Sequence, residues 1–518
     1  MSNLINGLNG DRIFRGMDHH QPTMDLNCDA VVVGSGAGGA VAAYELARAG
    51  LKVIILEAGP WVPSTEFTEE LSKSVPRLFQ DEGNQKSADG DLGVLQGRCV
   101  GGSTVVNAAA AFRTPDSVLK AWVEDHQLTE YSPENMRPFF ERVERNLSIH
   151  VNGPEERNAN ARVIEEGCDK LGYSHKPLAR NIKDCALTGF CLAGCKADRK
   201  QSMLVTYLPW AVNHHDARLF SDAMVTKILT EGDRAVGVQA VCSHNGKKVA
   251  DLTVRAPRVV LAAGAVQTPL LLQKDNLCNR SGQVGENFAC HPSVGMVGRM
   301  PDPVYGWEGA VLGSWVDEFA PKEKGGFILE TGMGEPWYMA ALAESGMGES
   351  HIDYMMHAKS YAGMISLIHD ENHGRVYADE DGKKIIDYRL HEKNFTSMKK
   401  SIEVMSEILF AAGSDLVYLP AYKLSIVKNM DEAMGEINAW DLRDQYVLRY
   451  TSFHPQGTAR MGVDPTQSVV NPRGESHDLR GLWLTDASIF PTSLMVNPQV
   501  TVYTLATMIS RNILRTSV

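Results

Sequence analysis

The chain has 518 residues, of which 43% are hydrophobic and 22% are charged. A chain of this length is expected to form two or more domains of a soluble globular protein, because it exceeds what one simple core organises. The formal net charge of −12 argues against nucleic acid or an anionic membrane as the main partner.

Residues 1–24 predict a polar, irregular arm. They lack the apolar core of a signal peptide and the paired arginines of the twin-arginine route, and no apolar run in the chain is long enough to span a bilayer. We therefore expect a cytoplasmic protein without a transmembrane segment. Its nine cysteines are an odd number and mostly scattered, so they are expected to be buried thiols rather than a disulfide framework.

Residues 29–59 predict a strand, a glycine turn, a helix and a second strand that ends at Glu57. Gly34 permits the tight turn, Gly36 allows the backbone to approach a pyrophosphate, and Gly39 allows the helix to pack on the strand. The helix N-terminus offers free N–H groups to phosphate, and Glu57 can accept hydrogen bonds from a ribose diol. The unit predicts dinucleotide binding but by itself leaves FAD and NAD open.

A second glycine-rich segment follows a stretch, residues 61–92, whose weak periodicity predicts a surface excursion. Residues 96–107 combine three glycines with two hydroxyl side chains and lead into small residues. This composition predicts another backbone segment pressed against the same flat ligand. A tight turn into a buried helix is the alternative.

The remaining elements are predicted from periodicity and from turn residues. Helices are expected at 118–126, 133–146, 159–171 and 397–412, antiparallel strands at 218–228 and 235–242, and a hairpin at 374–390. An apolar strand at 259–265 precedes a helix that Thr268 and Pro269 open, and a strand from 482 ends on Asp486. Asn497 and Pro498 open a last helix over 499–515, whereas residues 300–370 show poor periodicity.

Three cysteines lie close together on a glycine-rich loop. Cys185, Cys191 and Cys195 have the spacing C-x5-C-x3-C. Three thiolates can hold a [3Fe–4S] cluster, or zinc with a fourth ligand. A packed loop with inert thiols is the favoured alternative, so no metal is expected.

Four separated blocks resemble the glucose–methanol–choline (GMC) family of flavin oxidoreductases. They are the nucleotide unit, GRCVGGSTVVN at 97–107, GAVQTP at 264–269, and FHPQGTARMG at 453–462 through Asn497-Pro498. The resemblance covers almost the whole chain and is weakest over 301–450, which shapes the substrate pocket in this family.

The resemblance implies an α/β fold with two domains. A discontinuous Rossmann-type FAD-binding domain would comprise residues 25–125, 205–300 and 451–518. The second, substrate-binding domain would be built on an antiparallel sheet and would comprise residues 126–204 and 301–450.

The resemblance also implies FAD rather than NAD, and it implies which residues contact it. Some relatives attach FAD covalently through a histidine just before the asparagine of the second block. Val106 occupies that position here, so non-covalent FAD is expected. The implied cofactor-binding residues are Gly34, Ser35, Gly36, Gly39, Glu57, Arg98, Gly102, Ser103, Asn107, Val225, Asp486, Pro498 and Gln499.

Oxidation of an alcohol by a flavin needs a base for the hydroxyl proton. His454 is the predicted base, since unperturbed imidazole titrates near pH ~6.5. Asn497 is predicted to hydrogen-bond the substrate oxygen. The alternatives are that His454 is an ordinary loop residue and that Asn497 only caps the final helix. His291, which also precedes a proline, is expected to be structural.

The predicted function is FAD-dependent oxidation of a small-molecule alcohol to the aldehyde or ketone. Hydride would pass to flavin N5, and oxygen or another acceptor would then reoxidise the flavin. The alternatives are a flavin-dependent lyase of the same fold, the catalytic subunit of an iron–sulfur-containing dehydrogenase complex, an NAD-dependent reductase and a non-catalytic flavin-binding subunit. The sequence leaves open which alcohol is used, which acceptor is used and how many chains assemble.

Overall fold

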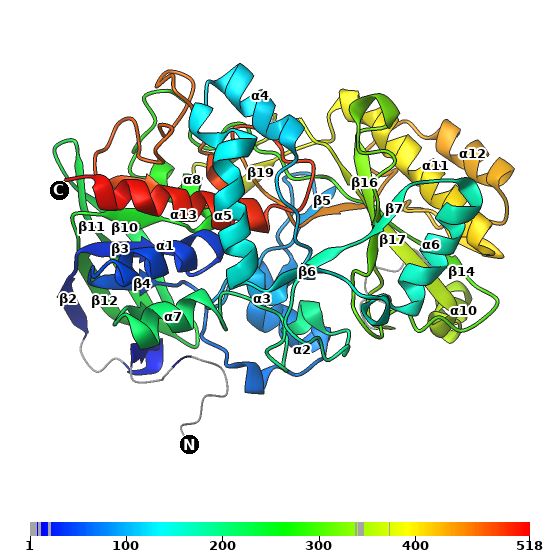
Figure 1. Cartoon of the computed structure of the whole chain (residues 1–518), viewed down its shortest axis with the longest axis horizontal. Coiled ribbons are helices and arrows are strands. Elements are labelled where there is room, and N and C mark those ends of the chain that lie inside the picture. The colour runs from blue at the N-terminus through cyan, green and yellow to red at the C-terminus, as the bar shows by residue number, and fades with distance from the viewer. Residues whose placement is uncertain are drawn as a thin grey trace.

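A six-stranded parallel sheet and a seven-stranded antiparallel sheet organise the molecule, at its left and right in Figure 1. The computed structural model describes residues 8, 12–18, 22–336, 339, 347–371 and 373–517. In sheet order the parallel strands are β1 (Ile13–Phe14), β9 (Arg218–Phe220), β4 (Val53–Leu56), β3 (Ala30–Val33), β13 (Val259–Leu261) and β23 (Leu482–Leu484). The central strands AVVV and VIIL are buried throughout, as a parallel sheet covered on both faces requires.

The helix of the nucleotide unit covers one side of this sheet. α1 (Ala37–Arg48) packs on β3 and β4, and both α13 (Gln499–Arg515) and α7 (Tyr207–His214) pack on α1. Figure 1 shows α13 in red beside α1 in blue. A four-stranded sheet contacts β4 and β13, in the order β10 (Ala223–Glu231), β11 (Arg234–His244), β12 (Lys247–Arg255) and β2 (Thr23–Asn27). The first and last parts of the chain therefore build one domain together.

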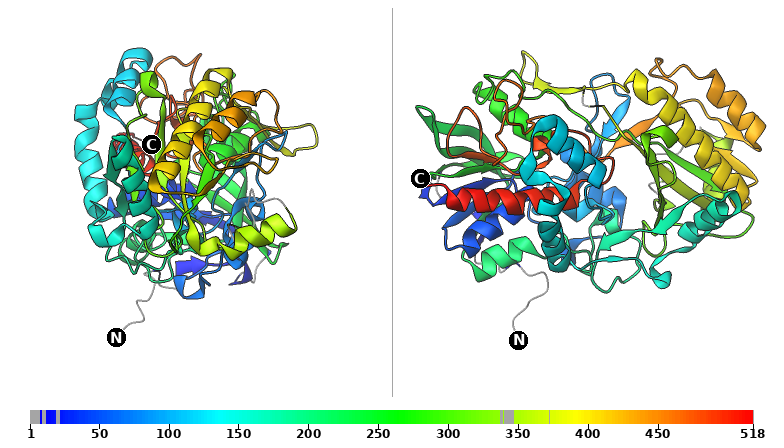
Figure 2. Two further views of the ribbon diagram at one scale, coloured as in Figure 1. Left: turned by 90° about the vertical axis from the view of Figure 1, so that its right-hand side faces the viewer. Right: turned by 45° about the horizontal axis from the view of Figure 1, so that its top comes forward.

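The second domain is built on the antiparallel sheet. Its strands, in sheet order, are β21 (Ile426–Val427), β20 (Leu416–Tyr418), β14 (Gly295–Arg299), β17 (Tyr361–Ile368), β16 (Phe327–Thr331), β15 (Ser314–Val316) and β7 (His175–Pro177). α6 (Ala159–Leu171) and α11 (Phe395–Ala412) pack on each other and on β17, and α12 (Met430–Ala439) packs on α11. Figure 2 shows α11 and α12 at the end of the molecule opposite the C-terminus.

Shorter elements connect and cover these sheets. The helices are α2 (Leu71–Leu78), α3 (Ser103–Val106), α4 (Asp116–His126), α5 (Pro133–Asn146), α8 (Gly264–Lys274) and α10 (Glu349–Met356). The strand pairs are β5 (Leu92–Val94) with β22 (Tyr450–Ser452), β6 (Ile149–Val151) with β8 (Ala179–Asn181), and β18 (Arg375–Ala378) with β19 (Lys384–Asp387). Short 3-10 helices are η2 (Gly16–Asp18), η3 (Ser64–Glu66), η4 (Gln80–Gly83), η5 (Thr129–Tyr131), η6 (Pro154–Glu156), η7 (Cys191–Ala193), η8 (Lys322–Lys324), η9 (Ala358–Ser360), η10 (Glu392–Asn394) and η11 (Ala487–Ile489).

The predicted fold class, a Rossmann-type α/β domain joined to a domain with an antiparallel sheet, is confirmed. Two of the predicted domain limits differ from the structure. β14 belongs to the antiparallel sheet, so the predicted boundary at residue 300 falls after the first strand of the second domain. α5 packs on α13, so the start of the segment 126–204 belongs with the first domain.

Four element predictions also need correction. The predicted N-terminal arm contributes β1 to the parallel sheet, and the predicted excursion at 61–92 contains α2, whose Leu71 and Leu78 are buried. The strand predicted at 218–228 is two strands, β9 and β10, because the chain turns at Asp222, where φ is +55°. α8 begins at Gly264, before the proline that was expected to open it.

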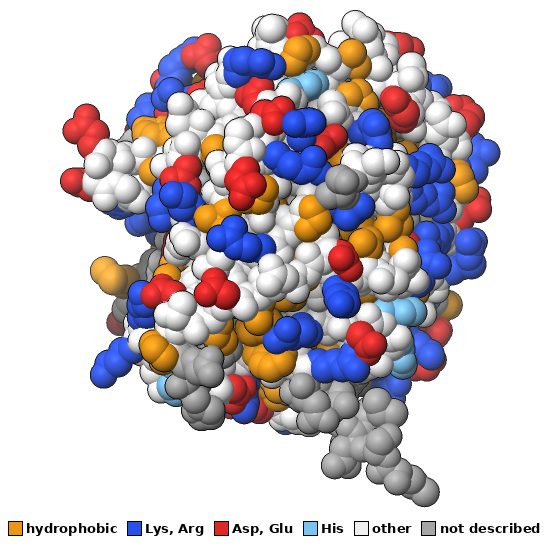
Figure 3. Space-filling view, turned by 90° about the vertical axis from the view of Figure 1, so that its left-hand side faces the viewer, with side chains coloured by type: hydrophobic (Ala, Val, Ile, Leu, Met, Phe, Trp, Pro, Cys, Tyr) orange, Lys and Arg blue, Asp and Glu red, His pale blue; other side chains and the backbone are white. Residues whose placement is uncertain are grey.

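The surface that faces the viewer in Figure 3, on the left of Figure 1, mixes charges of both signs. Lys and Arg side chains lie among Asp and Glu side chains there, and only small hydrophobic patches lie between them. Among the residues that the structure describes, no helix is both long enough and apolar enough to cross a membrane.

Candidate functional site

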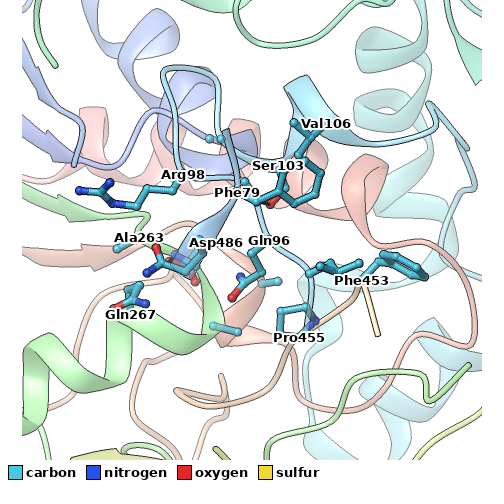
Figure 4. A pocket seen from close by; sticks show the side chains of 18 of the residues that line it. Phe79, Gln96, Arg98, Ser103, Val106, Ala263, Gln267, Phe453, Pro455 and Asp486 are labelled. Carbon is cyan, nitrogen blue, oxygen red and sulfur yellow. Dashed lines mark hydrogen bonds between the residues drawn. The ribbon is translucent and has the colours of Figure 1, made fainter. Parts of the chain in front are cut away.

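A cavity of about 1270 Å³ lies between the glycine turns of the first domain and the antiparallel sheet of the second. It exceeds the roughly 300–1,000 Å³ of ordinary small-ligand pockets, so it has room for a large cofactor together with a substrate. Figure 4 shows side chains gathered around it from the second glycine block, the start of α8 and the C-terminal segment: Arg98, Ser103, Val106, Ala263, Gln267, Phe453, Pro455 and Asp486.

The two glycine turns touch each other at the wall of this cavity. Gly34 has a φ of +97°, which glycine adopts without strain. A Cβ on Gly102 would lie 2.8 Å from the Cα of Gly36, and a Cβ on Gly39 would lie 1.9 Å from the carbonyl oxygen of Gly34. Side chains at these positions would separate segments that the fold holds in contact. The two turns thus form a backbone cradle open to the cavity.

Glu57 holds the first glycine turn in place through hydrogen bonds. Its Oε2 accepts hydrogen bonds from the backbone N–H of Ser35 (2.9 Å) and from Ser35 Oγ (2.7 Å), and its Oε1 accepts one from Gly59 (2.8 Å). Burial raises the pKa of this carboxyl, although these hydrogen bonds oppose the effect. Ser35 Oγ also accepts the N–H of Gly101 (3.0 Å), so one buried network joins both glycine turns.

The structure places the predicted cofactor-binding residues on the wall of this cavity, with two exceptions. Ser35 is fully buried away from the cavity and acts through Glu57 and Gly101. Gly39 lies behind the turn, where it allows α1 to pack closely. The residues that line the cavity are Gly34, Gly36, Glu57, Arg98, Gly102, Ser103, Asn107, Val225, Asp486, Pro498 and Gln499.

Hydrogen bonds hold several of these side chains in place. Asp486 accepts from the N–H of Gly264 (2.9 Å) and from Thr268 Oγ1 (2.6 Å), so its carboxylate fixes the first turn of α8 against the cavity. Asn107 Nδ2 donates to Gln499 Oε1 (2.9 Å), which joins the second glycine block to the start of α13. These two links connect segments that are far apart in the chain.

Both predicted reaction residues line this cavity. His454 is buried, and this burial lowers its pKa to about 3, so its imidazole is neutral at physiological pH. Asn497 is not the cap of the final helix, because α13 has Pro498 at its N-cap position and no side-chain cap bond. Asn497 Oδ1 is buried without a hydrogen-bond partner among the described residues. Its amide oxygen is therefore available to a ligand.

Glu330 is a third member of this cluster that the sequence did not reveal. It lies on β16, is 1% exposed and lines the cavity with His454 and Asn497. Burial raises the pKa of Glu330 to about 8, and a hydrogen bond from Asn497 opposes part of that rise. Its Oε1 has no partner among the described residues. The only sequence signal was a lone acid within an apolar strand, FILET.

His291, which was expected to be structural, contacts the predicted base directly. Its Nδ1 lies 3.2 Å from Nδ1 of His454, and its side chain is fully buried. Its backbone has a φ of +52°, in the left-handed region that residues other than glycine seldom adopt. Such conformations persist where the surrounding structure fixes them, and they cluster at functional sites.

The cysteine loop lies behind the second glycine block. Burial raises the pKa of the Cys191 thiol, and Cys195 Sγ accepts the backbone N–H groups of Arg199 (3.3 Å) and Lys200 (3.4 Å). Lys200 Nζ donates to the carbonyl of Asn107 (2.6 Å), which connects this loop to the cavity wall. All nine cysteines are free thiols. Within the described ranges no three potential ligands are arranged to hold a metal ion, and the absence of a metal stays a prediction.

The chain matches the family model described as GMC oxidoreductase in two parts, the N-terminal domain over residues 29–293 and the C-terminal domain over residues 370–506. A long-chain-alcohol oxidase of Arabidopsis thaliana is 28% identical over 524 residues, which cover 98% of this chain and 71% of the relative. An uncharacterized GMC-type oxidoreductase of Mycobacterium tuberculosis is 31% identical over 482 residues, which cover 92% of this chain and 74% of the relative.

A solved structure shares the fold. The crystal structure of pyridoxine 4-oxidase from Mesorbium loti aligns with a TM-score of 0.73, at 20% sequence identity. The alignment covers 95% of this chain and 100% of that one. Both domains and their connections are therefore common to the two proteins.

Proposed function

The chain belongs to the GMC oxidoreductase family, and from this premise we propose that it oxidises an alcohol to an aldehyde or ketone with FAD as cofactor. One observation carries the proposal. The same cavity combines a backbone cradle suited to a dinucleotide with a buried cluster of His454, Asn497 and Glu330. A site for binding a dinucleotide alone does not need two buried oxygen atoms, Asn497 Oδ1 and Glu330 Oε1, that have no hydrogen-bond partner among the described residues.

The residues present fit FAD. The contact between Gly36 and Gly102 leaves no side chain between the backbone and a pyrophosphate, and the first turn of α1 has no side-chain cap. Arg98, whose guanidinium donates to Ala58 O (3.0 Å), supplies a positive charge on the same wall. When bound, FAD accepts a hydride from the carbon that bears the hydroxyl group. With Val106 at the position of the linking histidine, we propose that FAD is held without a covalent bond.

The chain's own residues orient the alcohol and take up its proton. Asn497 and His454 hold the hydroxyl oxygen, and burial of the cluster keeps bulk water away from it. The sequence-based prediction assigns the proton to His454. The burial of Glu330 in the same cavity wall and its unpartnered Oε1 support Glu330 as a second candidate acceptor. Oxygen or another electron acceptor then removes the electrons from the reduced cofactor.

We propose an apolar alcohol as the substrate. On the side of the second domain, where β16 carries Glu330, the cavity wall includes Val311, Leu312, Met333, Ile365 and Leu367. Such a wall accommodates an aliphatic or aromatic group and offers no partners for the hydroxyl groups of a sugar. The similarity to a long-chain-alcohol oxidase supports this class of substrate.

An anaerobic screen of the flavin-loaded protein tests the proposal. Aliphatic, aromatic, sterol and sugar alcohols are mixed with it one at a time, and the loss of flavin absorbance is followed. We expect apolar alcohols to bleach the flavin and sugars to leave it oxidised. If no alcohol bleaches it, the lyase or the non-catalytic subunit is the better interpretation. Stoichiometric iron and sulfide would instead support a subunit of an iron–sulfur dehydrogenase.

A further inference from the structure

The hydrogen bonds around His291 determine which of its ring nitrogens carries the proton. The backbone N–H of Met495 donates to His291 Nε2 (3.1 Å), so Nε2 acts as an acceptor and carries no hydrogen. The side-chain amide nitrogen of Gln456 lies 3.2 Å from the same atom. It also donates to the carbonyl oxygen of His454 (3.2 Å), which only accepts, so the orientation of this amide is fixed. A neutral His291 therefore carries its hydrogen on Nδ1.

The tautomer of His291 dictates the tautomer of His454. The two Nδ1 atoms are 3.2 Å apart, and a hydrogen bond between them needs one donor and one acceptor. Because Nδ1 of His291 is the donor, Nδ1 of His454 is the acceptor. A neutral His454 then carries its hydrogen on Nε2. Burial lowers the pKa of both imidazoles, and the neighbouring His454 and His369 lower that of His291 further, so both imidazoles are neutral.

The backbone conformations of His291 and Met495 bear on how the His291 ring is held. His291 has a φ of +52° and Met495 a φ of +67°. A hydrogen bond joins these two residues, and left-handed conformations of this kind persist where the surrounding structure fixes them. The orientation of His291 is thus built into the fold and does not depend on a bound ligand.

The remaining ring nitrogen of His454 is the one available to the cavity. Across the described residues Nε2 of His454 makes no hydrogen bond, and His454 lines the cavity. A nitrogen that carries hydrogen donates to the substrate oxygen and has no lone pair for its proton. The carboxyl of Glu330 on β16 lines the same cavity, and its Oε1 has no partner.

We propose that His291 is a positioning residue that holds His454 in its Nε2–H tautomer, so that His454 donates to the alcohol oxygen while the Glu330 carboxylate takes the hydroxyl proton. This proposal rests on the proposed alcohol oxidation. As the O–H bond breaks, its proton passes to the ionised form of Glu330, which predominates above pH ~8 because burial raises the pKa of this carboxyl. As the C–H bond breaks, its hydrogen and electron pair pass to the bound FAD, and a C=O bond forms. The hydrogen bond from His454 stabilises the negative charge that develops on the oxygen.

The tautomer is tested directly, without turnover. ¹⁵N NMR of the FAD-loaded protein with labelled histidine distinguishes protonated from bare ring nitrogens, and H454Q identifies the His454 signals. We expect the wild type to be protonated on Nε2 of His454. In H291D a carboxylate oxygen replaces the donor, so His454 should shift to protonation on Nδ1 or on both nitrogens. H291N is the matched control, because asparagine has the size of aspartate but carries no charge. Asparagine and aspartate both tolerate the positive φ at this position.

A wild-type protein with His454 protonated only on Nδ1 would overturn the proposal. So would an H291D protein, folded by circular dichroism, in which the His454 signals are unchanged. Neither readout needs a substrate. Failure of every alcohol to reduce the flavin would therefore count against the proposed function alone.

The roles of donor and acceptor are tested by anaerobic flavin reduction. Glutamine at 454 places an amide N–H where Nε2–H was, so H454Q should react about tenfold faster than H454L, a difference typical of one hydrogen bond. E330Q should react about 10²–10⁴-fold more slowly than wild type, as loss of a general base does. E407Q is the control and should keep the wild-type rate. It changes a carboxylate that accepts a hydrogen bond from the hydroxyl of Tyr173. If H454Q is as slow as H454L and E330Q reacts like wild type, His454 is the base and the proposal is wrong.

Discussion

At the scale of single residues, Glu330 makes the stability of the protein depend on pH. Its pKa is raised from 4.5 to about 8 by burial, so the unfolded state releases this proton more readily than the folded state. The contribution of Glu330 to stability is fully present below pH ~4.5 and is lost as pH rises through about 8. At about 1.36 kcal/mol per pKa unit, the loss is at most about 5 kcal/mol.

E330Q removes this titration. We expect E330Q to melt at a higher temperature than the wild type at pH 9, with the difference shrinking toward pH 5. Differential scanning calorimetry of the two flavin-loaded proteins across this range provides the measurement. A difference that is the same at pH 5 and pH 9 would show that Glu330 keeps an ordinary pKa in the folded protein.

Gly102 is the residue whose substitution should harm the cofactor site most directly. Its φ is +56° and its ψ is −149°, and an added Cβ would lie 2.8 Å from the Cα of Gly36. We expect G102A to lose about 1–3 kcal/mol of stability and to be purified with less flavin. The ratio of flavin to protein absorbance and the melting temperature are the measurements.

The matched control is Gly435 in α12, where an added Cβ meets nothing within 4 Å. G435A should gain about 0.5–1 kcal/mol and keep its flavin, because alanine favours a helix over glycine. A G102A protein that keeps full flavin content would mean that the two glycine turns can separate without cost to the cofactor.

At the scale of elements, α8 illustrates how a distant side chain completes a helix. Pro269 lies inside α8 and has no N–H for the carbonyl of Ala265, four residues earlier. Thr458 Oγ1 donates to that carbonyl instead, at 2.6 Å. The sequence predicted that Thr268 and Pro269 open the helix, which is the usual place for proline. The substitute donor lies almost two hundred residues away and could not be foreseen.

Thr458→Val keeps the shape of this buried side chain but removes its donor. We expect it to destabilise the protein by about 1–3 kcal/mol, the cost of leaving a buried carbonyl unpaired. Thr466→Val in the exposed turn after Asp464 is the control and should cost less, because water replaces its hydrogen bond. Urea denaturation of both variants measures the difference, and equal costs would contradict this account of α8.

Elements with local signals were predicted well. α5 and α6 have the predicted limits, because Ser132 and Asn158 cap their first turns and Gly172 ends α6. The strands of the antiparallel sheet between residues 295 and 368 gave no such signal. Their side chains are buried by tertiary contacts, and the strands that pair with them are remote in the chain. Glu330 escaped notice for the same reason. Its role depends on which face of β16 meets the cavity, and only the packed sheet decides that.

At the scale of the whole molecule, the cavity proposed for the cofactor is lined by residues of both domains. The cavity wall takes Gly34 and Asp486 from the first domain and Glu330 and Ile365 from the second. A ligand that binds only the folded protein stabilises it, by about 4 kcal/mol when its concentration is 1,000 times Kd. Removal of FAD should therefore weaken both domains together.

We expect acid precipitation to release all of the flavin into solution, since Val106 offers no atom for a covalent link. Protein freed of flavin by dialysis should melt at a lower temperature, and added FAD should restore the original value. Calorimetry with and without FAD measures this shift. Flavin that stays in the acid pellet would contradict non-covalent binding, and an unchanged melting temperature would contradict stabilisation by the cofactor.

The pairing of α1 with α13 also has a consequence for synthesis on the ribosome. α1 is complete at Arg48, whereas the helix that packs on it begins at Gln499, and β23 reaches the parallel sheet only at Leu482. At a synthesis rate of about 5–20 residues per second, about 20–90 s pass between the synthesis of α1 and that of α13. During this time the apolar face of α1 lacks the helix that covers it. We therefore expect the unfinished first domain to expose apolar surface during translation, and we expect FAD to bind only after the last helix has been made.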